Sequence, residues 1–158
     1  MTIIVDSREK EHVIGGILAE FDRQKVVYTV SKLPVADYMS LDNARLLIDR
    51  KHNLYELGTN LCTNDRTRFW KEVREAKRLG VKIIVLCEHG GAYHTIQDVG
   101  NWPGYDIQDK NGRAFHISGR DLMEKMYKVH ISYGVEFLFC DKRQTGKRII
   151  ELLGGGVK

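Results

Sequence analysis

The chain has 158 residues, of which 42% are hydrophobic and 29% charged, and its formal net charge is +4. This length and composition indicate one globular domain. No apolar run is long enough to span a bilayer, and the N-terminus enters a short strand rather than a signal peptide, so no membrane association is expected. The modest positive charge is compatible with a polyanionic partner but does not require one.

The cysteines indicate a cytoplasmic protein. Cys62, Cys87 and Cys140 are odd in number and widely spaced, which argues against a disulfide scaffold and for a reducing compartment. Cys87 lies near His89 and His94, as in some zinc sites, but no Cys-x-x-Cys pair accompanies them. The simpler interpretation is a buried strand cysteine followed by loop histidines.

The first half of the chain predicts alternating strands and helices. A strand at 3–5 precedes a helix whose apolar residues recur at helical spacing, although Gly15 and Gly16 interrupt it. A strand at about 25–31 follows. A helical region then covers about 53–79, broken near 63–65 and ended by Gly80.

The second half continues this alternation. Residues 82–87 form a nearly continuous apolar run, typical of a central strand covered on both faces. Residues 88–114 lose periodicity, which predicts a long loop. A capping box at 118–121 opens a helix, residues 135–140 form a strand, and a last helix starts near 144 and ends at Gly154 to Gly156. The pattern predicts an α/β fold with a mixed sheet.

An antiparallel hairpin is expected where two strand-like runs, 35–41 and 45–51, flank the turn-forming residues 42–44. With a three-residue connection, a type I turn with a bulge, Asp37 faces Asp49. A two-residue connection without a compensating bulge would point these carboxylates to opposite faces. Directly opposed Cβ atoms lie about 4.5–5.5 Å apart, which lets two carboxylates reach one cation.

The chemistry of these residues fits phosphodiester hydrolysis. Lys51 follows Asp49 by two residues and therefore shares its face of the strand. Two carboxylates that share a divalent cation, with a lysine beside them, are the minimal parts for the reaction. The spacing alone is a weak signal, because exposed Asp and Lys residues are usually solvated surface.

Five segments give the pattern more weight. The chain resembles, over about residues 2–153, the XPF-type nuclease domain, the branched-DNA endonuclease branch of the PD-(D/E)XK superfamily. The matching segments are IVDSRE at 4–9 (V-D-x-R-E), LPVADY at 33–38 (L-x-x-G-D-Y), LIDRK at 47–51 (E-R-K), the R-F helix at 66–69 and the I-x-x-x-x-E strand at 83–88. This resemblance implies a restriction-endonuclease-like mixed central sheet flanked by helices.

Three positions depart from the family pattern. Ala36 replaces the glycine before the first motif Asp, which narrows the backbone freedom there. Asp49 replaces a Glu and is one methylene shorter. Tyr55 occupies a position that is usually Asp, with Glu56 beside it, so the role of that further acid is open.

The resemblance implies a role for each matching residue. Asp37, Asp49 and Lys51 would be catalytic; Asp37 and Asp49 would hold Mg²⁺ or Mn²⁺ together with the Arg50 backbone carbonyl. Lys51 would orient the attacking water or stabilise charge on the phosphate. The residues Asp6, Arg8, Glu9 and Arg50 would support the site; alternatively Arg8 and Glu9 form a local ion pair, and Arg50 buttresses the acidic residues from behind the sheet.

Basic residues after the hairpin are candidates for DNA contacts. Arg66, Arg68, Lys71 and Arg74 could contact phosphates, and a solvated helix face is the alternative for Lys71 and Arg74. In the long loop, Trp102, Tyr105 and Arg113 could stack on or clamp a distorted strand, with a packed loop core as the alternative for Trp102.

The sequence therefore predicts a single nuclease domain over 1–158, without a helix-hairpin-helix domain. It would be a divalent-metal-dependent endonuclease acting on branched DNA, such as a flap, fork or four-way junction, in recombination or repair. The alternative is a catalytically silent DNA-binding or scaffolding module of the same fold. A homodimer or a partner protein is possible, and the apolar segments 135–139 and 149–153 are candidates for an interface or for core. A small-molecule-binding domain is disfavoured, because residues 6–9 lack a Gly-rich phosphate loop.

Overall fold

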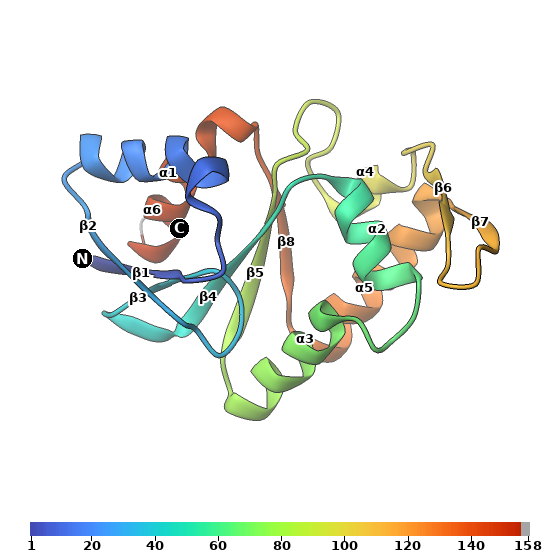
Figure 1. The fold of residues 1–158 in the computed structure, drawn as a ribbon, viewed down its shortest axis with the longest axis horizontal. Coiled ribbons are helices and arrows are strands. Elements are labelled where there is room, and N and C mark those ends of the chain that lie inside the picture. Colours follow the sequence, from blue (N-terminus) through green and yellow to red (C-terminus); the bar gives the residue numbers. More distant parts are fainter. Residues whose placement is uncertain (156–158) are drawn as a thin grey trace.

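The computed structural model describes residues 1–155. A six-stranded mixed sheet, in the order β2-β1-β3-β4-β5-β8, runs through the middle of the molecule (Figure 1). Its strands are β1 (Thr2–Asp6), β2 (Val27–Ser31), β3 (Tyr38–Ser40), β4 (Asn43–Lys51), β5 (Lys82–Cys87) and β8 (Glu136–Phe139). β3 is antiparallel to both its neighbours, and the remaining pairs are parallel. The α/β class and mixed sheet predicted from the sequence are confirmed.

Helices cover both faces of the sheet. One face carries α1 (Glu11–Arg23) and α6 (Thr145–Leu153), which follows a short 3₁₀ turn, η1 (Lys142–Gln144). The other carries α2 (Leu54–Cys62), α3 (Arg68–Leu79), the short α4 (Ile96–Val99) and α5 (Gly119–Tyr133). Two apolar cores result, one on each side. No helix within the described residues is long and apolar enough to cross a membrane.

Most helix boundaries follow local capping chemistry. Asn53, Thr67 and Ser118 accept hydrogen bonds from backbone N–H groups of α2, α3 and α5. Gly80 and Gly134 end α3 and α5 in the left-handed conformation that glycine adopts without a Cβ penalty. The predicted break near 63–65 and the capping box at 118–121 are both confirmed.

The predicted long loop was only partly right. Residues 88–114 contain α4 and the strand β6 (Tyr105–Gln108), which pairs with β7 (Ala114–Ile117) in a separate two-stranded hairpin. Each strand is four residues long, too short for a clear alternating pattern. This hairpin lies at the edge of the molecule, beside α2 and α5 (Figure 1).

The predicted connection between β3 and β4 was wrong, although the register near the carboxylates was right. The turn consists of two residues, Leu41 and Asp42, and Ser40 pairs with Asn43. A bulge between Met39 and Ser40 then restores the register, so that Tyr38 pairs with Ile48. The bulge thus compensates for the shorter turn.

The segments considered as core or interface contribute to the core. Val135 and Phe137 pack in the core on the α2, α3 and α5 side, and Ile149, Leu152 and Leu153 pack in the other core. Cys87 is fully buried in β5, as the sequence suggested. Gly156, placed by the sequence at the end of the last helix, lies outside the described residues.

Candidate active site

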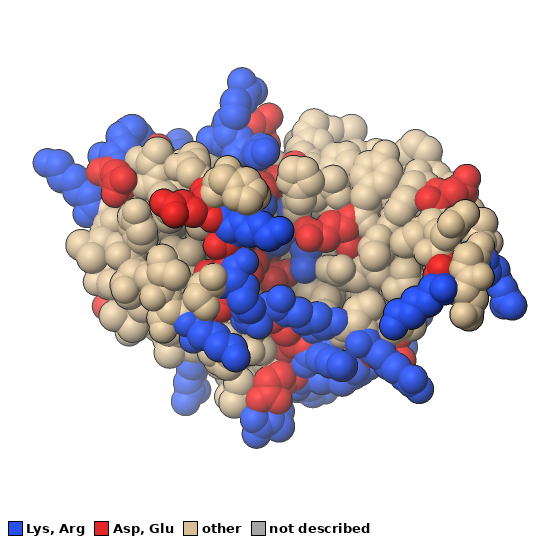
Figure 2. All heavy atoms as spheres, viewed as in Figure 1, with Lys and Arg blue, Asp and Glu red and all other residues tan. Residues whose placement is uncertain are grey.

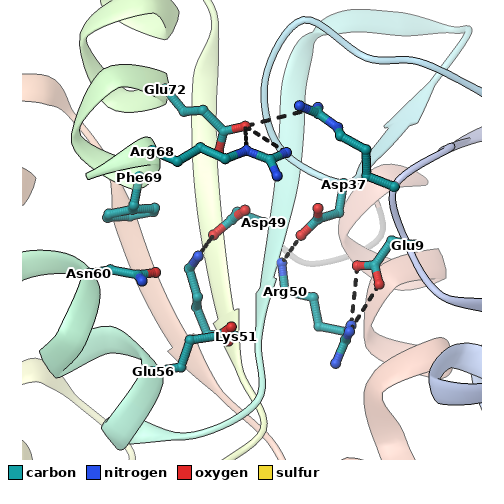
Figure 3. A pocket seen from close by; sticks show the side chains of 11 residues that line it. Glu9, Asp37, Asp49, Arg50, Lys51, Glu56, Asn60, Arg68, Phe69 and Glu72 are labelled. Atoms are coloured by element: carbon teal, nitrogen blue, oxygen red, sulfur yellow. Dashed lines mark hydrogen bonds and ion pairs between the residues drawn. The ribbon is translucent and has the colours of Figure 1, made fainter. Parts of the chain in front are cut away.

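A polar pocket of about 280 Å³ opens where the end of β4 meets α2 and α3 (Figure 3). Its lining combines carboxylates with cationic side chains from several segments of the chain. The acids are Glu9, Asp37, Asp49, Glu56 and Glu72; the cations are Arg8, Arg50, Lys51 and Arg68; and Asn60 and Phe69 complete the lining. Such a concentration of opposite charges in one hollow is typical of a site that handles a charged ligand.

Asp49 lies at the centre of this pocket. Because side chains alternate along β4, Leu47, Asp49 and Lys51 share the face toward α2 and α3, whereas Arg50 points to the other face. Asp49 is only 3% exposed, and its Oδ2 atom faces the Lys51 ammonium at 3.1 Å without accepting a hydrogen bond from any other described residue. A carboxylate oxygen has more than one acceptor position, so Oδ2 can also take a bound cation or a substrate donor.

Asp37 enters the same pocket from the residue just before β3. Its backbone N–H donates to the Ile48 carbonyl at 2.9 Å, and its Oδ2 accepts the Arg50 backbone N–H at 2.7 Å. Burial raises the pKa of Asp37 well above its usual value, and the neighbouring charges of Asp49 and Glu9 raise it further. The structure therefore brings Asp37 and Asp49 together, as predicted.

Lys51 pairs with Asp49 across the same strand face. The Nζ atom lies 3.1 Å from Asp49 Oδ2 and 4.6 Å from the centre of the Phe69 ring. Burial lowers the pKa of Lys51, but the carboxylates of Asp49 and Glu56 raise it by more, so that the ammonium stays charged. This places a fixed positive charge on the pocket wall (Figure 3).

The donor set fits a hard divalent cation. Within residues 1–155, no group of three or more His, Cys, Asp or Glu side chains is arranged to hold a metal ion. Mg²⁺, however, is usually bound by one or two carboxylates and keeps several waters. Asp37 and Asp49 supply that number, and a cation bound between them would share Asp49 Oδ2 with the Lys51 ammonium.

Asp6 and Arg8 form a separate pair beside the pocket. Asp6 is fully buried, and its carboxylate accepts Arg8 Nε at 2.6 Å and the Leu33 backbone N–H at 2.8 Å. Asp6 does not line the pocket, whereas Arg8 does and reaches to 4.0 Å from Glu72. The suggested local pair between Arg8 and Glu9 was wrong, because Glu9 pairs with Arg50.

The Arg50 side chain is held between two carboxylates. Its guanidinium donates to Glu9 at 2.9 Å and to Glu88 at 2.7 Å. Burial lowers the pKa of Arg50, but its hydrogen bonds to the two carboxylates raise it by more. Glu88 also accepts the Thr145 hydroxyl of α6 at 2.6 Å. The backbone that donates to Asp37 is therefore anchored to the neighbouring elements.

Sequence reasoning missed Glu72, Asn60 and Phe69 as lining residues. Glu72 lies 3.4 Å from Arg68 Nε, and burial followed by the charge of Asp49 raises its pKa. A signal for Glu72 is present in the sequence, since it falls one helical turn after Arg68. The apolar face of α3 is the stronger pattern in the same segment and hides it.

The four candidate DNA-contacting residues lie in different surroundings. Arg68 lines the pocket, and Lys71 projects from the exposed face of α3. Arg74 donates to the Asp65 carbonyl and lies over Trp70, which ties it to the protein. Arg66 lies in a second hollow next to β6 and β7. Figure 2 shows Lys and Arg side chains around an acidic centre, in the region of β4 and α3.

Trp102 and Tyr105 are packed rather than free to stack. Trp102 is 5% exposed and meets Tyr55 and Tyr105 at ring-centre distances of 5.2 and 5.7 Å. The Tyr105 hydroxyl donates to the Tyr55 carbonyl at 2.8 Å. The packed-core interpretation of Trp102 is thus the one that the structure supports, and Arg113 remains exposed on the hairpin.

Comparison with known proteins identifies the family. The ERCC4 domain model matches residues 5–153, almost the whole chain. The chain belongs to the ERCC4 domain family. No curated protein sequence matches it.

The ERCC4 fold is also present in solved structures of XPF from Aeropyrum pernix. One superposes with a TM-score of 0.67 at 18% identity, covering 100% of this chain and 66% of that chain. A second, of the same protein in complex with DNA, gives a TM-score of 0.64 at 17% identity and covers 98% and 64%. The chain thus spans slightly less than two thirds of these relatives, and at this identity the likeness shows the fold.

The departures from the XPF-type motif have clear positions in this ERCC4 domain. Ala36 adopts a φ of 61°, the left-handed region that glycine occupies most easily, so the alanine retains the backbone shape at some cost in strain. Tyr55 points to the aromatic group around Trp102 and does not line the pocket. Glu56 does line it and accepts the His52 backbone N–H at 2.8 Å.

Proposed function

We propose that this ERCC4 domain is a divalent-metal-dependent endonuclease that hydrolyses phosphodiester bonds in branched DNA. The observation that carries the proposal is the buried carboxylate of Asp49, which faces the same pocket as Asp37 and pairs through Oδ2 with the Lys51 ammonium at 3.1 Å. Membership of a family of structure-specific endonucleases supports the reaction class. The complex of XPF from Aeropyrum pernix with DNA supports the choice of DNA as substrate.

The acidic residues of the pocket would bind the metal ion, and the basic residue Lys51 would contact the phosphate. Asp37 and Asp49, with the Arg50 backbone carbonyl, would hold Mg²⁺ or Mn²⁺. Such an ion, when bound, makes water more acidic and offsets charge on the phosphate. Lys51 would place its ammonium against a phosphate oxygen as charge develops there. Its contact with Phe69 and its ion pair with Asp49 would fix its position before substrate arrives.

The supporting residues would act through the backbone. Glu9 and Glu88 would hold the Arg50 guanidinium, and the Arg50 N–H would hold Asp37. Asp6 and Arg8 would fix the start of the segment that leads from Leu33 to Asp37, because both bind the backbone of Leu33. The basic residues that would contact phosphates, and so position the DNA without reading its sequence, are Arg66, Arg68, Lys71 and Arg74.

Glu56 and Glu72 are the candidates for the acid that is absent at Tyr55. Both line the pocket, and Glu72 is close enough to Asp49 to feel its charge. Glu56 is tied to the backbone N–H of His52 at the start of α2, and Glu72 is next to Arg68. We favour Glu72 as the additional acid, because burial has already removed part of its hydration.

A cleavage assay tests the proposal. The native chain is incubated with labelled flap, four-way junction and plain duplex DNA in Mg²⁺, Mn²⁺ or EDTA. Asp49→Asn removes a proposed ligand, and Asp22→Asn, an exposed residue of α1, is the matched control. We expect metal-dependent cleavage of a branched substrate that Asp49→Asn lowers by at least about 100-fold and Asp22→Asn leaves unchanged. No cleavage, or equal cleavage by Asp49→Asn, would favour the catalytically silent module.

A further inference from the structure

The β6–β7 hairpin has an apolar face that extends beyond the part covered by α2. Tyr105 pairs with Ile117 and Ile107 pairs with Phe115, so all four side chains share one face of the hairpin. The first pair packs on α2, where a Cβ at Gly58 would lie 3.1 Å from the Tyr105 ring. Gly58 therefore permits the close approach of the hairpin to this helix.

The second pair faces a groove instead of the core. Ile107 and Phe115 are half-buried and line a hollow of about 810 Å³ between the hairpin and the α2–α3 connection. The opposite wall is polar, with Thr59, Thr63 and Thr67. An apolar cross-strand pair left open to solvent beside hydroxyl groups suits a ligand with a flat apolar face and polar edges.

The groove is lined by two cations and two acids. Arg66 and Lys110 line it, and neither has an ion-pair partner within residues 1–155. The two acids of the groove are engaged locally. Asp109 accepts the backbone N–H groups of Asn111 and Arg113, each at 2.9 Å, and Asp65 lies 3.9 Å from Arg74. Arg66 and Lys110 are therefore available to phosphate groups, beside two acids whose charge the backbone N–H groups and Arg74 partly offset.

The groove adjoins the candidate active site. Thr59 lines the groove and Asn60, the next residue of α2, lines the active-site pocket. Likewise Thr67 lines the groove and Arg68 lines the pocket. Two hollows thus flank the same α2–α3 connection.

We propose that this groove binds unpaired nucleotides of a branched DNA substrate. A base would stack on Phe115 against Ile107, and Arg66 and Lys110 would contact the flanking phosphates. The proposal rests on the proposed function for its substrate class. Phe115 and Ile107 of the β6–β7 hairpin would then provide the base stacking that Trp102 and Tyr105, which are both packed, cannot provide.

A binding assay without metal tests the groove independently of cleavage. The parent is Asp49→Asn in EDTA, and the probes are a short fluorescein-labelled oligothymidylate and a labelled duplex with and without a single-stranded flap. Phe115→Ala removes the stacking ring. The double variant Arg66→Ala/Lys110→Ala removes the free cations from exposed positions, where folding is not at risk. Lys142→Ala/Lys147→Ala, on η1 and α6, is the matched control.

We expect the parent and the control to bind the oligothymidylate and to prefer the flapped duplex. Phe115→Ala should weaken oligothymidylate binding by about fivefold or more. The double variant should make the logarithmic salt dependence of oligothymidylate binding shallower, by about 0.7 for each phosphate that its missing cations would neutralise. Absence of oligothymidylate binding, or equal binding by the parent and both groove variants, would overturn the proposal. If the native chain still cleaves a flap in that case, the proposed function stands without the groove.

Discussion

At the scale of single residues, two aspartates at the ends of neighbouring strands, Asp6 and Asp37, differ in the charges around them. Burial by itself would raise the pKa of Asp6, but Arg8 and two backbone N–H groups lower it by more. Asp37 receives one backbone N–H and faces Asp49 and Glu9, so that burial and repulsion raise its pKa. The first arrangement stabilises the fold, whereas the second is unfavourable unless a cation is present.

The pH dependence of stability reports this repulsion. Asp37 and Glu72 have pKa values raised above those of the unfolded chain, so the folded state binds their protons more tightly. In EDTA, the free energy of unfolding should rise as the pH falls from neutral through these raised values. Asp37→Asn should raise the free energy of unfolding at neutral pH and make it less dependent on pH. Urea unfolding at a series of pH values measures both effects.

Asp6 affects the stability in a separate, lower pH range and therefore does not obscure the effect of Asp37. The lowered pKa of Asp6 stabilises the fold above about 3.8, its ordinary value, and that stabilisation is lost only as the pH falls further. Between neutral pH and that limit, Asp37 and Glu72 therefore change the stability and Asp6 does not. A stability that falls with pH across this range, equally in the native chain and Asp37→Asn, would contradict the account.

At the scale of elements, the carboxylate pair depends on the connection between β3 and β4. Alternation and turn chemistry predicted the strands and the register near Asp37, but not the turn itself. The structure uses a two-residue turn plus a bulge, and both solutions place Tyr38 opposite Ile48. Local sequence does not distinguish them, because the register is set by which face of β4 is buried against α2 and α3.

Contacts between elements that lie far apart in the chain could not be predicted from the sequence either. The hairpin register and strand alternation predicted that Asp37, Asp49 and Lys51 meet. They did not predict that Glu72 of α3 joins them or that Glu88 holds Arg50. The β6–β7 hairpin was invisible because its strands are short and its polar turn resembles loop sequence. These features arise from packing between elements, which periodicity does not encode.

The link between β4, β5 and α6 gives an element-scale prediction. Glu88→Gln removes the charge that balances Arg50 and weakens the hydrogen bonds to Arg50 and Thr145. The free energy of unfolding should fall by about 1.5 kcal/mol, the contribution of a hydrogen bond to a charged group. Urea unfolding measures it.

The control for this substitution is Glu136→Gln. Glu136 also pairs with a cation, Lys82, but both side chains are more than 40% exposed. Its substitution should cost less than about 1 kcal/mol, because solvent screens surface pairs. Equal costs at the two positions would show that the Arg50 network contributes no more than a surface ion pair.

At the scale of the whole molecule, the layered fold places the pocket at the surface, between the end of β4 and the helices α2 and α3. The sheet carries Asp49 and Lys51 to the end of β4, and α2 and α3 form the far wall. Basic side chains surround this acidic hollow on the face shown in Figure 2. The chain spans slightly less than two thirds of the XPF relatives it matches. The candidate active site and the groove beside it both lie within this span.

The central claim is that Asp37 and Asp49 together bind one divalent cation. Calorimetric titration of the metal-free protein with Mn²⁺ tests it directly and does not depend on DNA or turnover. We expect one ion to bind the native chain and Asp22→Asn alike, and Asp49→Asn to lose at least about 100-fold in affinity. Failure of the native chain to bind Mn²⁺, or equal binding by Asp49→Asn, would contradict the account.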